Sequence, residues 1–232
     1  MHFTIKSLVI FILLISNGNA LSRTMDVTIQ YNSDLDESCS NAKNYKIKDS
    51  WKKELKIKQS QLTQEWDNYG EKLLLETENL VGHKFNRAFV TANLALCKTP
   101  SRSLPLTINM RYSLSTFTNN PVSIHVKVGT LYHELLHPYI TNNLMTNSPL
   151  LTLYIKEPQR VKDHLHLLAL LKAVYSNVGM ADKLSSIIEV DNSLPNGFYK
   201  RAWEIVNSTP NYYLEFIGEL QTTKPNKALK RN

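Results

Sequence analysis

Two histidines and a glutamate in the stretch LYHELLHPYI, residues 131–140, have the spacing His133-Glu134-x-x-His137. On a helix, residues i and i+4 lie on one face, so both imidazoles can direct a ring nitrogen at one metal ion. Glu134 follows the first histidine and can reach a water at that metal without binding the metal itself. A metal that lowers the pKa of water, with a base beside it, is the chemistry that peptide-bond hydrolysis needs. A coincidental match inside a core helix is the alternative.

This motif resembles the zincin superfamily of zinc metallopeptidases, which carry HExxH on an active-site helix behind a mixed sheet. The resemblance is specific over residues 130–139 and architectural over about 88–180. It implies Zn²⁺ held by His133 and His137, with Glu134 as general base and proton shuttle. It also implies a peptide or protein substrate that pairs with an edge strand of the sheet, for which 105–114 is the best candidate.

The sequence departs from the known branches of that superfamily. The metzincin extension needs Gly and His after the core motif, but Ile140 and Asn143 stand at those positions. Glu157 has the spacing of the third ligand in the thermolysin-like branch, but the following proline favours extended backbone there. Pro138 clashes with the carbonyl group of Glu134 in a continuing helix, so we expect the motif helix to end or kink at that point.

A catalytic zinc site needs three protein ligands and one open position, so a further ligand must come from elsewhere. The segment 162–175, KDHLHLLALLKAVY, is the natural source. His164 shares a helical stripe with Leu168, Leu171 and Tyr175 and should face the core, whereas His166 should lie on a more exposed flank. We predict His164 as the third ligand, followed by His166 and then by Glu157. Packing roles for both histidines are the alternative.

The expected fold is α+β and zincin-like, with a small mixed sheet, an active-site helix and a helical C-terminal half. The motif helix should open after Asn120, with Pro121 at its first position, or only near Gly129. A long amphipathic helix over 49–80 should be broken near Gly70. The other expected elements are strands at 25–31, 90–96 and 106–114 and helices at 159–178, 181–190, 197–206 and 210–220.

The first twenty residues have the organisation of a secretory signal peptide. Lys6 gives a positive start, residues 8–15 are an unbroken apolar run, and Gly18-x-Ala20 offers small residues for cleavage. We therefore expect an exported protein, periplasmic or secreted, without an integral membrane segment after cleavage. Residues 21–223 should form a single domain. In an oxidising compartment Cys39 and Cys97 can form a disulfide, with Cα atoms within about 7 Å.

The net charge of +7 is concentrated in two places, residues 43–58 and a C-terminal tail at 224–232 that we expect to be disordered. No interleaving of aromatic and basic residues indicates a nucleic-acid module, so a solvated helix face is favoured over nucleic-acid binding. The preferred interpretation is an exported zinc-dependent metallopeptidase. The alternatives are a non-catalytic secreted zinc-binding protein, that is a degenerate zincin, and a basic secreted protein in which the motif is coincidental.

Overall fold

The computed structural model describes residues 25–222, so the predicted signal peptide (1–20) and basic tail (224–232) lie outside the described residues. The fold is mixed α/β and largely helical. Its strands are β1 (Asp26–Tyr31), β2 (Phe89–Ala95), β3 (Arg102–Ser103) and β4 (Leu106–Asn109). Its helices are α1 (Ser33–Lys43), α2 (Asp49–Val81), α3 (Ile124–Asn143), α4 (Pro149–Leu153), α5 (Gln159–Asn177), α6 (Ala181–Ser193), α7 (Phe198–Val206) and α8 (Tyr213–Gln221), with a short 3-10 helix at Arg111–Ser113.

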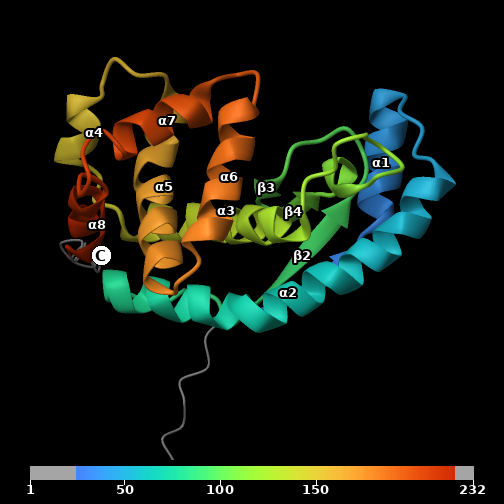
Figure 1. The fold of residues 1–232 in the computed structure, drawn as a ribbon, viewed down its shortest axis with the longest axis horizontal. Coiled ribbons are helices and arrows are strands. Elements are labelled where there is room, and N and C mark those ends of the chain that lie inside the picture. Colours follow the sequence, from blue (N-terminus) through green and yellow to red (C-terminus); the bar gives the residue numbers. More distant parts are fainter. Residues whose placement is uncertain (1–24, 223–232) are drawn as a thin grey trace, which may run out of the picture.

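The long helix α2 runs along the whole molecule, and the sheet and the C-terminal helices lie towards its two ends (Figure 1). Helix α3 crosses the middle, where it contacts α2, strands β3 and β4, and helices α5 and α6. One apolar cluster joins these parts, and Leu62, Leu73 and Leu168 are fully buried in it. Within residues 25–222, no helix is both long enough and apolar enough to cross a membrane. The motif helix is therefore held between the sheet and the helical half.

The sheet is mixed, and its strand order within the described residues is β1-β2-β4-β3. Strands β1, β2 and β4 are parallel, whereas β3 is antiparallel to β4. The prediction that 105–114 forms an edge strand is wrong, because β4 lies between β2 and β3. The strand also ends at Asn109, since Ser113 and Leu114 donate backbone hydrogen bonds to Met110 and Arg111 and turn the chain. The edges of the sheet are β1 and the short β3.

Helix α2 is continuous, so the predicted break near Gly70 is wrong. A Cβ atom at Gly70 would overlap the indole ring of Trp66, which is buried. The glycine therefore makes room for a large side chain inside the helix, and the helical backbone is preserved.

Helix α1 is an element that the sequence pattern did not indicate. Its N-cap, Asn32, accepts a hydrogen bond from the backbone N–H of Leu35, and its buried Asp36 accepts bonds from the N–H groups of Leu96 and Cys97. The predicted disulfide is confirmed: Cys39 is bonded to Cys97 with a Cα–Cα distance of 6.1 Å. Tertiary contacts thus fix α1 against the end of β2.

Candidate metal centre

The HExxH motif lies on α3, as predicted, but the bounds of this helix differ from both expected starts. Ser123 is the N-cap and the helix begins at Ile124. The helix also continues through Pro138 to Asn143, so the expected end at the proline is wrong. Proline has no N–H, which leaves the carbonyl group of Glu134 without its usual helical donor. In the following turn, the side chain of Thr141 donates to the carbonyl oxygen of His137.

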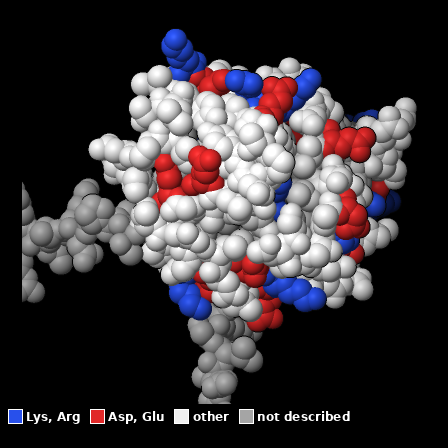
Figure 2. Space-filling view, turned by 60° about the vertical axis from the view of Figure 1, so that its left-hand side comes forward, with Lys and Arg blue, Asp and Glu red and all other residues white. Residues whose placement is uncertain are grey.

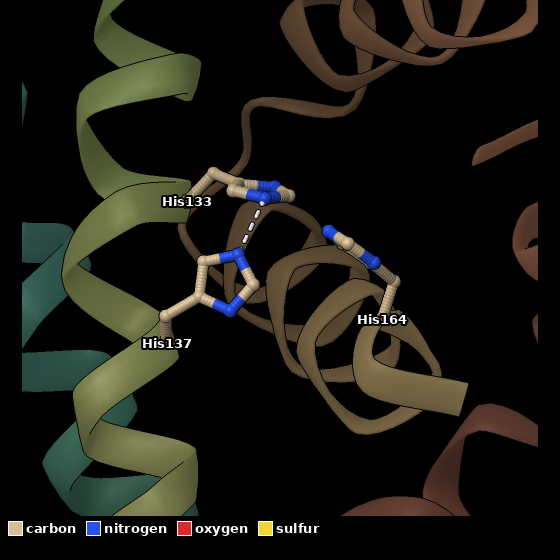
Figure 3. Close-up of side chains that lie close together, drawn as sticks. All are labelled: His133, His137 and His164. Atoms are coloured by element: carbon tan, nitrogen blue, oxygen red, sulfur yellow. Dashed lines mark hydrogen bonds between the residues drawn. The ribbon is translucent and has the colours of Figure 1, made fainter. Parts of the chain in front are cut away.

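Three imidazoles converge between α3 and α5 (Figure 3). The Nε2 atoms of His133 and His137 are 3.1 Å apart, and one ligand atom from each of His133, His137 and His164 lies within 4.8 Å of the others. Two nitrogens that bind a tetrahedral zinc ion at about 2.1 Å are themselves about 3.4 Å apart. The spacing of the α3 pair is therefore close to that of a zinc site.

His164 comes from the first turns of α5 and has one ring nitrogen occupied. Its Nδ1 donates a hydrogen bond to the carbonyl oxygen of Arg160 at 2.6 Å. Its Nε2 is buried and has no hydrogen-bond partner within residues 25–222. Metal-binding histidines have this arrangement, in which one N–H bonded to a carbonyl oxygen fixes the tautomer and leaves the other nitrogen for the metal. This nitrogen can therefore serve as a metal ligand.

Burial lowers the pKa of all three histidines. It lowers the pKa of His137 to about 4 and that of His133 well below its ordinary value, and the neighbouring imidazoles add to both effects. The pKa of His164 is also lowered, again mainly by burial. The three rings are consequently neutral near pH 7, which is the state that binds a metal.

Glu134 lies beside this cluster and is 7% exposed. Burial raises the pKa of its carboxyl to about 8, and no described residue donates a hydrogen bond to it. A divalent cation close by opposes this effect, because it stabilises the ionised carboxylate.

Tyr199 on α7 lies against the imidazole cluster, a contact that the sequence did not predict. The centroid of its ring is 4.6 Å from that of His164 and 5.7 Å from that of His133. Burial raises the pKa of its phenol, and the charges of Asp191 and Glu134 add to this effect. Helix α7 is held on α6 by a hydrogen bond of 2.9 Å from Trp203 Nε1 to Asp191. A tyrosine in a helix has no local signal of function, so only the fold reveals it.

The two alternative ligands, His166 and Glu157, lie outside the cluster. His166 is 1% exposed and its Nε2 is 2.7 Å from Oε2 of Glu219, so the predicted exposed flank is wrong. Helix α5 is buried on most of its circumference, which removes the expected difference between its flanks. Glu157 forms an ion pair with Arg201 at 2.6 Å.

A scan against protein-family models found no match for this chain. Searches among curated proteins and among solved structures likewise found none.

Proposed function

We propose that the protein is a zinc-dependent metallopeptidase of zincin type, with His133, His137 and His164 as metal ligands. The observation that carries the proposal is the orphaned, buried Nε2 of His164, which faces two further imidazoles on the motif helix. Three nitrogen ligands with a carboxylate beside them are typical of a catalytic zinc site, whereas structural sites have four protein ligands. The position of the motif helix, in contact with a mixed sheet, also supports a zincin-like fold.

When bound, zinc would acidify a water and polarise the carbonyl group of the scissile peptide bond. Glu134 would be the general base that accepts a proton from the attacking water and the acid that returns it to the leaving amine nitrogen. The hydroxyl of Tyr199 donates no hydrogen bond to any described residue, so it is free to donate one to the carbonyl oxygen of the substrate as negative charge develops there. His164 is kept in the binding tautomer by Arg160.

Export through the N-terminal segment is part of the same proposal. The disulfide between Cys39 and Cys97 supports it, since disulfides persist mainly in oxidising compartments. Proteins and peptides outside the cytoplasm would be the substrates.

The test is the metal content of the purified chain, followed by cleavage of casein and of a quenched fluorogenic peptide with and without chelator. Glu134→Gln should retain zinc and lose at least about a hundredfold in cleavage rate, because the amide accepts no proton. Glu71→Gln, an exposed position on α2, is the matched control and should behave as the parent chain does. Near-full activity of Glu134→Gln contradicts the role given to this residue.

A zinc-binding protein without catalytic activity is the second candidate. The three-imidazole cluster is compatible with it, because these ligands can hold a metal without the base Glu134. Zinc without chelator-sensitive cleavage would support this candidate. Absence of zinc would leave the motif as a coincidence.

A further inference from the structure

The edge of the sheet that lies furthest from β3 exposes hydrogen-bonding groups. Asp26 and Asn32 donate backbone hydrogen bonds to Ala88 and Leu94 on the side of β2. Because successive residues of a strand direct their N–H and C=O groups to opposite edges, Val27, Ile29 and Tyr31 direct theirs away from β2. Of these outward groups, the carbonyl oxygen of Ile29 is the one with a hydrogen-bond partner within residues 25–222. It accepts a bond of 3.3 Å from the side-chain amide of Gln59. Strand β1 is therefore open to a further strand.

A cleft of about 300 Å³ lies where α2 passes Tyr31 at the end of this strand. Its floor is mainly apolar and includes the buried Leu55. Lys52, Lys53 and Lys56 also line it, and all three are exposed. The strand edge and the cleft together offer backbone pairing, an apolar floor and side-chain recognition to an extended segment.

The charge of the cleft is positive. Its lining contains three lysines but one acidic residue, Asp49. The carboxylate of Asp49 is 3.9 Å from the ammonium group of Lys52. By contrast, on the face shown in Figure 2 the basic side chains are scattered among acidic ones and a broad central area is uncharged. The cleft is thus a local concentration of positive charge beside unpaired backbone groups.

We propose that β1 and the lysine-lined cleft bind an extended, acidic segment of a partner protein by strand addition. The segment pairs with the outward N–H and C=O groups of Val27 and Tyr31 and with the N–H of Ile29, whose carbonyl oxygen is bonded to Gln59. Its acidic side chains on one face meet Lys52, Lys53 and Lys56, and the apolar part of its chain covers Leu55. This inference does not depend on the metal centre, which lies on α3 beside the opposite edge of the sheet.

The probe is a fluorescein-labelled eight-residue peptide in which Glu alternates with Val, and the same peptide with Lys in place of Glu is the control ligand. Binding to the full mature chain is measured by fluorescence anisotropy at low ionic strength. Lys52→Glu/Lys56→Glu should weaken binding of the acidic peptide about tenfold. Lys72→Glu/Lys156→Glu changes the charge of the chain equally at two exposed positions that do not line the cleft, and should leave most of the affinity for the acidic peptide.

Amide hydrogen exchange separates strand addition from mere charge attraction. Bound peptide should slow exchange at Val27, Ile29 and Tyr31, and Val27→Pro should abolish binding because its ring occupies the edge. If Val27→Pro does not fold, the exchange data on the parent chain decide. Equal binding of both peptides, or binding without protection of these amides, would overturn the proposal, as would failure of the acidic peptide to bind.

Discussion

His164 and His166 lie two residues apart on the same helix and have opposite surroundings. His166 is bonded to Glu219, and the same carboxylate accepts hydrogen bonds from the hydroxyl of Ser148 and the N–H of Leu150. This network ties α4 and α8 to α5 and leaves its buried groups satisfied. His164 instead keeps a buried nitrogen without a partner in the described chain. Both histidines are thus largely enclosed, but only His164 combines an unpartnered ring nitrogen with two neighbouring imidazoles.

The largest expected difference between the two positions is in metal binding. His164→Ala removes a ligand and should weaken zinc binding by more than about a hundredfold, with loss of chelator-sensitive cleavage. His166→Ala should leave one zinc per chain, since its imidazole is directed at Glu219. Competition with a chromophoric chelator measures both affinities. Equal zinc affinity in the two variants would contradict the assignment of His164, and not His166, as a metal ligand.

The next effect concerns stability and should appear when the hydrogen-bond network around Glu219 is broken. Glu219→Ala leaves the groups of Ser148, Leu150 and His166 without their acceptor and should lower the free energy of unfolding by about 3 kcal/mol. Denaturant unfolding of the zinc-free chain measures it. Glu215→Ala, on the exposed side of the same helix, is the matched control and should change stability little. A large loss in the control alone would contradict the role of the network.

Asp191 is intermediate between His164 and His166, because it is half-buried and has one hydrogen-bond partner, Trp203. Burial raises its pKa from 3.8 to about 6, so the folded chain holds this proton more tightly than the unfolded chain does. Stability from this group is present below the unfolded pKa and is lost as the pH rises through about 6. Asp191→Asn cannot ionise and should therefore gain about 2 kcal/mol of stability relative to the parent between about pH 4 and pH 7. Unfolding at several pH values, with Asp182→Asn as the exposed control, tests this sign.

The smallest expected effect is that of removing the hydroxyl group of Tyr199, whose ring contacts the imidazoles. Tyr199→Phe keeps the ring contacts with His133 and His164 but removes the hydroxyl. Cleavage should fall about tenfold in kcat while zinc content is unchanged. Tyr112→Phe, at a surface ring, is the control. An unchanged kcat in Tyr199→Phe would restrict this residue to packing.

Much of the fold was predictable where periodicity is strong. The alternation in β1 and β2 and the 3.6-residue period of α2 correspond to real elements, because each buries one face of a regular structure. Helix α1 escaped prediction because its sequence is polar and its position depends on Asp36 and Cys39, whose partners are distant in sequence. Strand β4 was predicted too long because the alternation of residues continues where the backbone turns.

The candidate site was likewise predictable only where it depends on local geometry. The HExxH pair is local, so helical geometry alone brings His133 and His137 together. The choice between His164 and His166 depends on the rotation of α5, which sequence fixes poorly for a helix buried on most sides. Tyr199 depends on the packing of α7 on α6, which no short motif encodes.

X-ray absorption spectroscopy of the zinc-loaded mature chain tests the central claim most directly. We expect one zinc per chain with three imidazole nitrogens at about 2.0–2.1 Å and one exchangeable oxygen ligand. His164→Ala should lose one imidazole from this shell, whereas His166→Ala should retain all three. A chain that binds no zinc, or a spectrum with fewer than three imidazoles in the parent protein, would contradict the three-histidine centre.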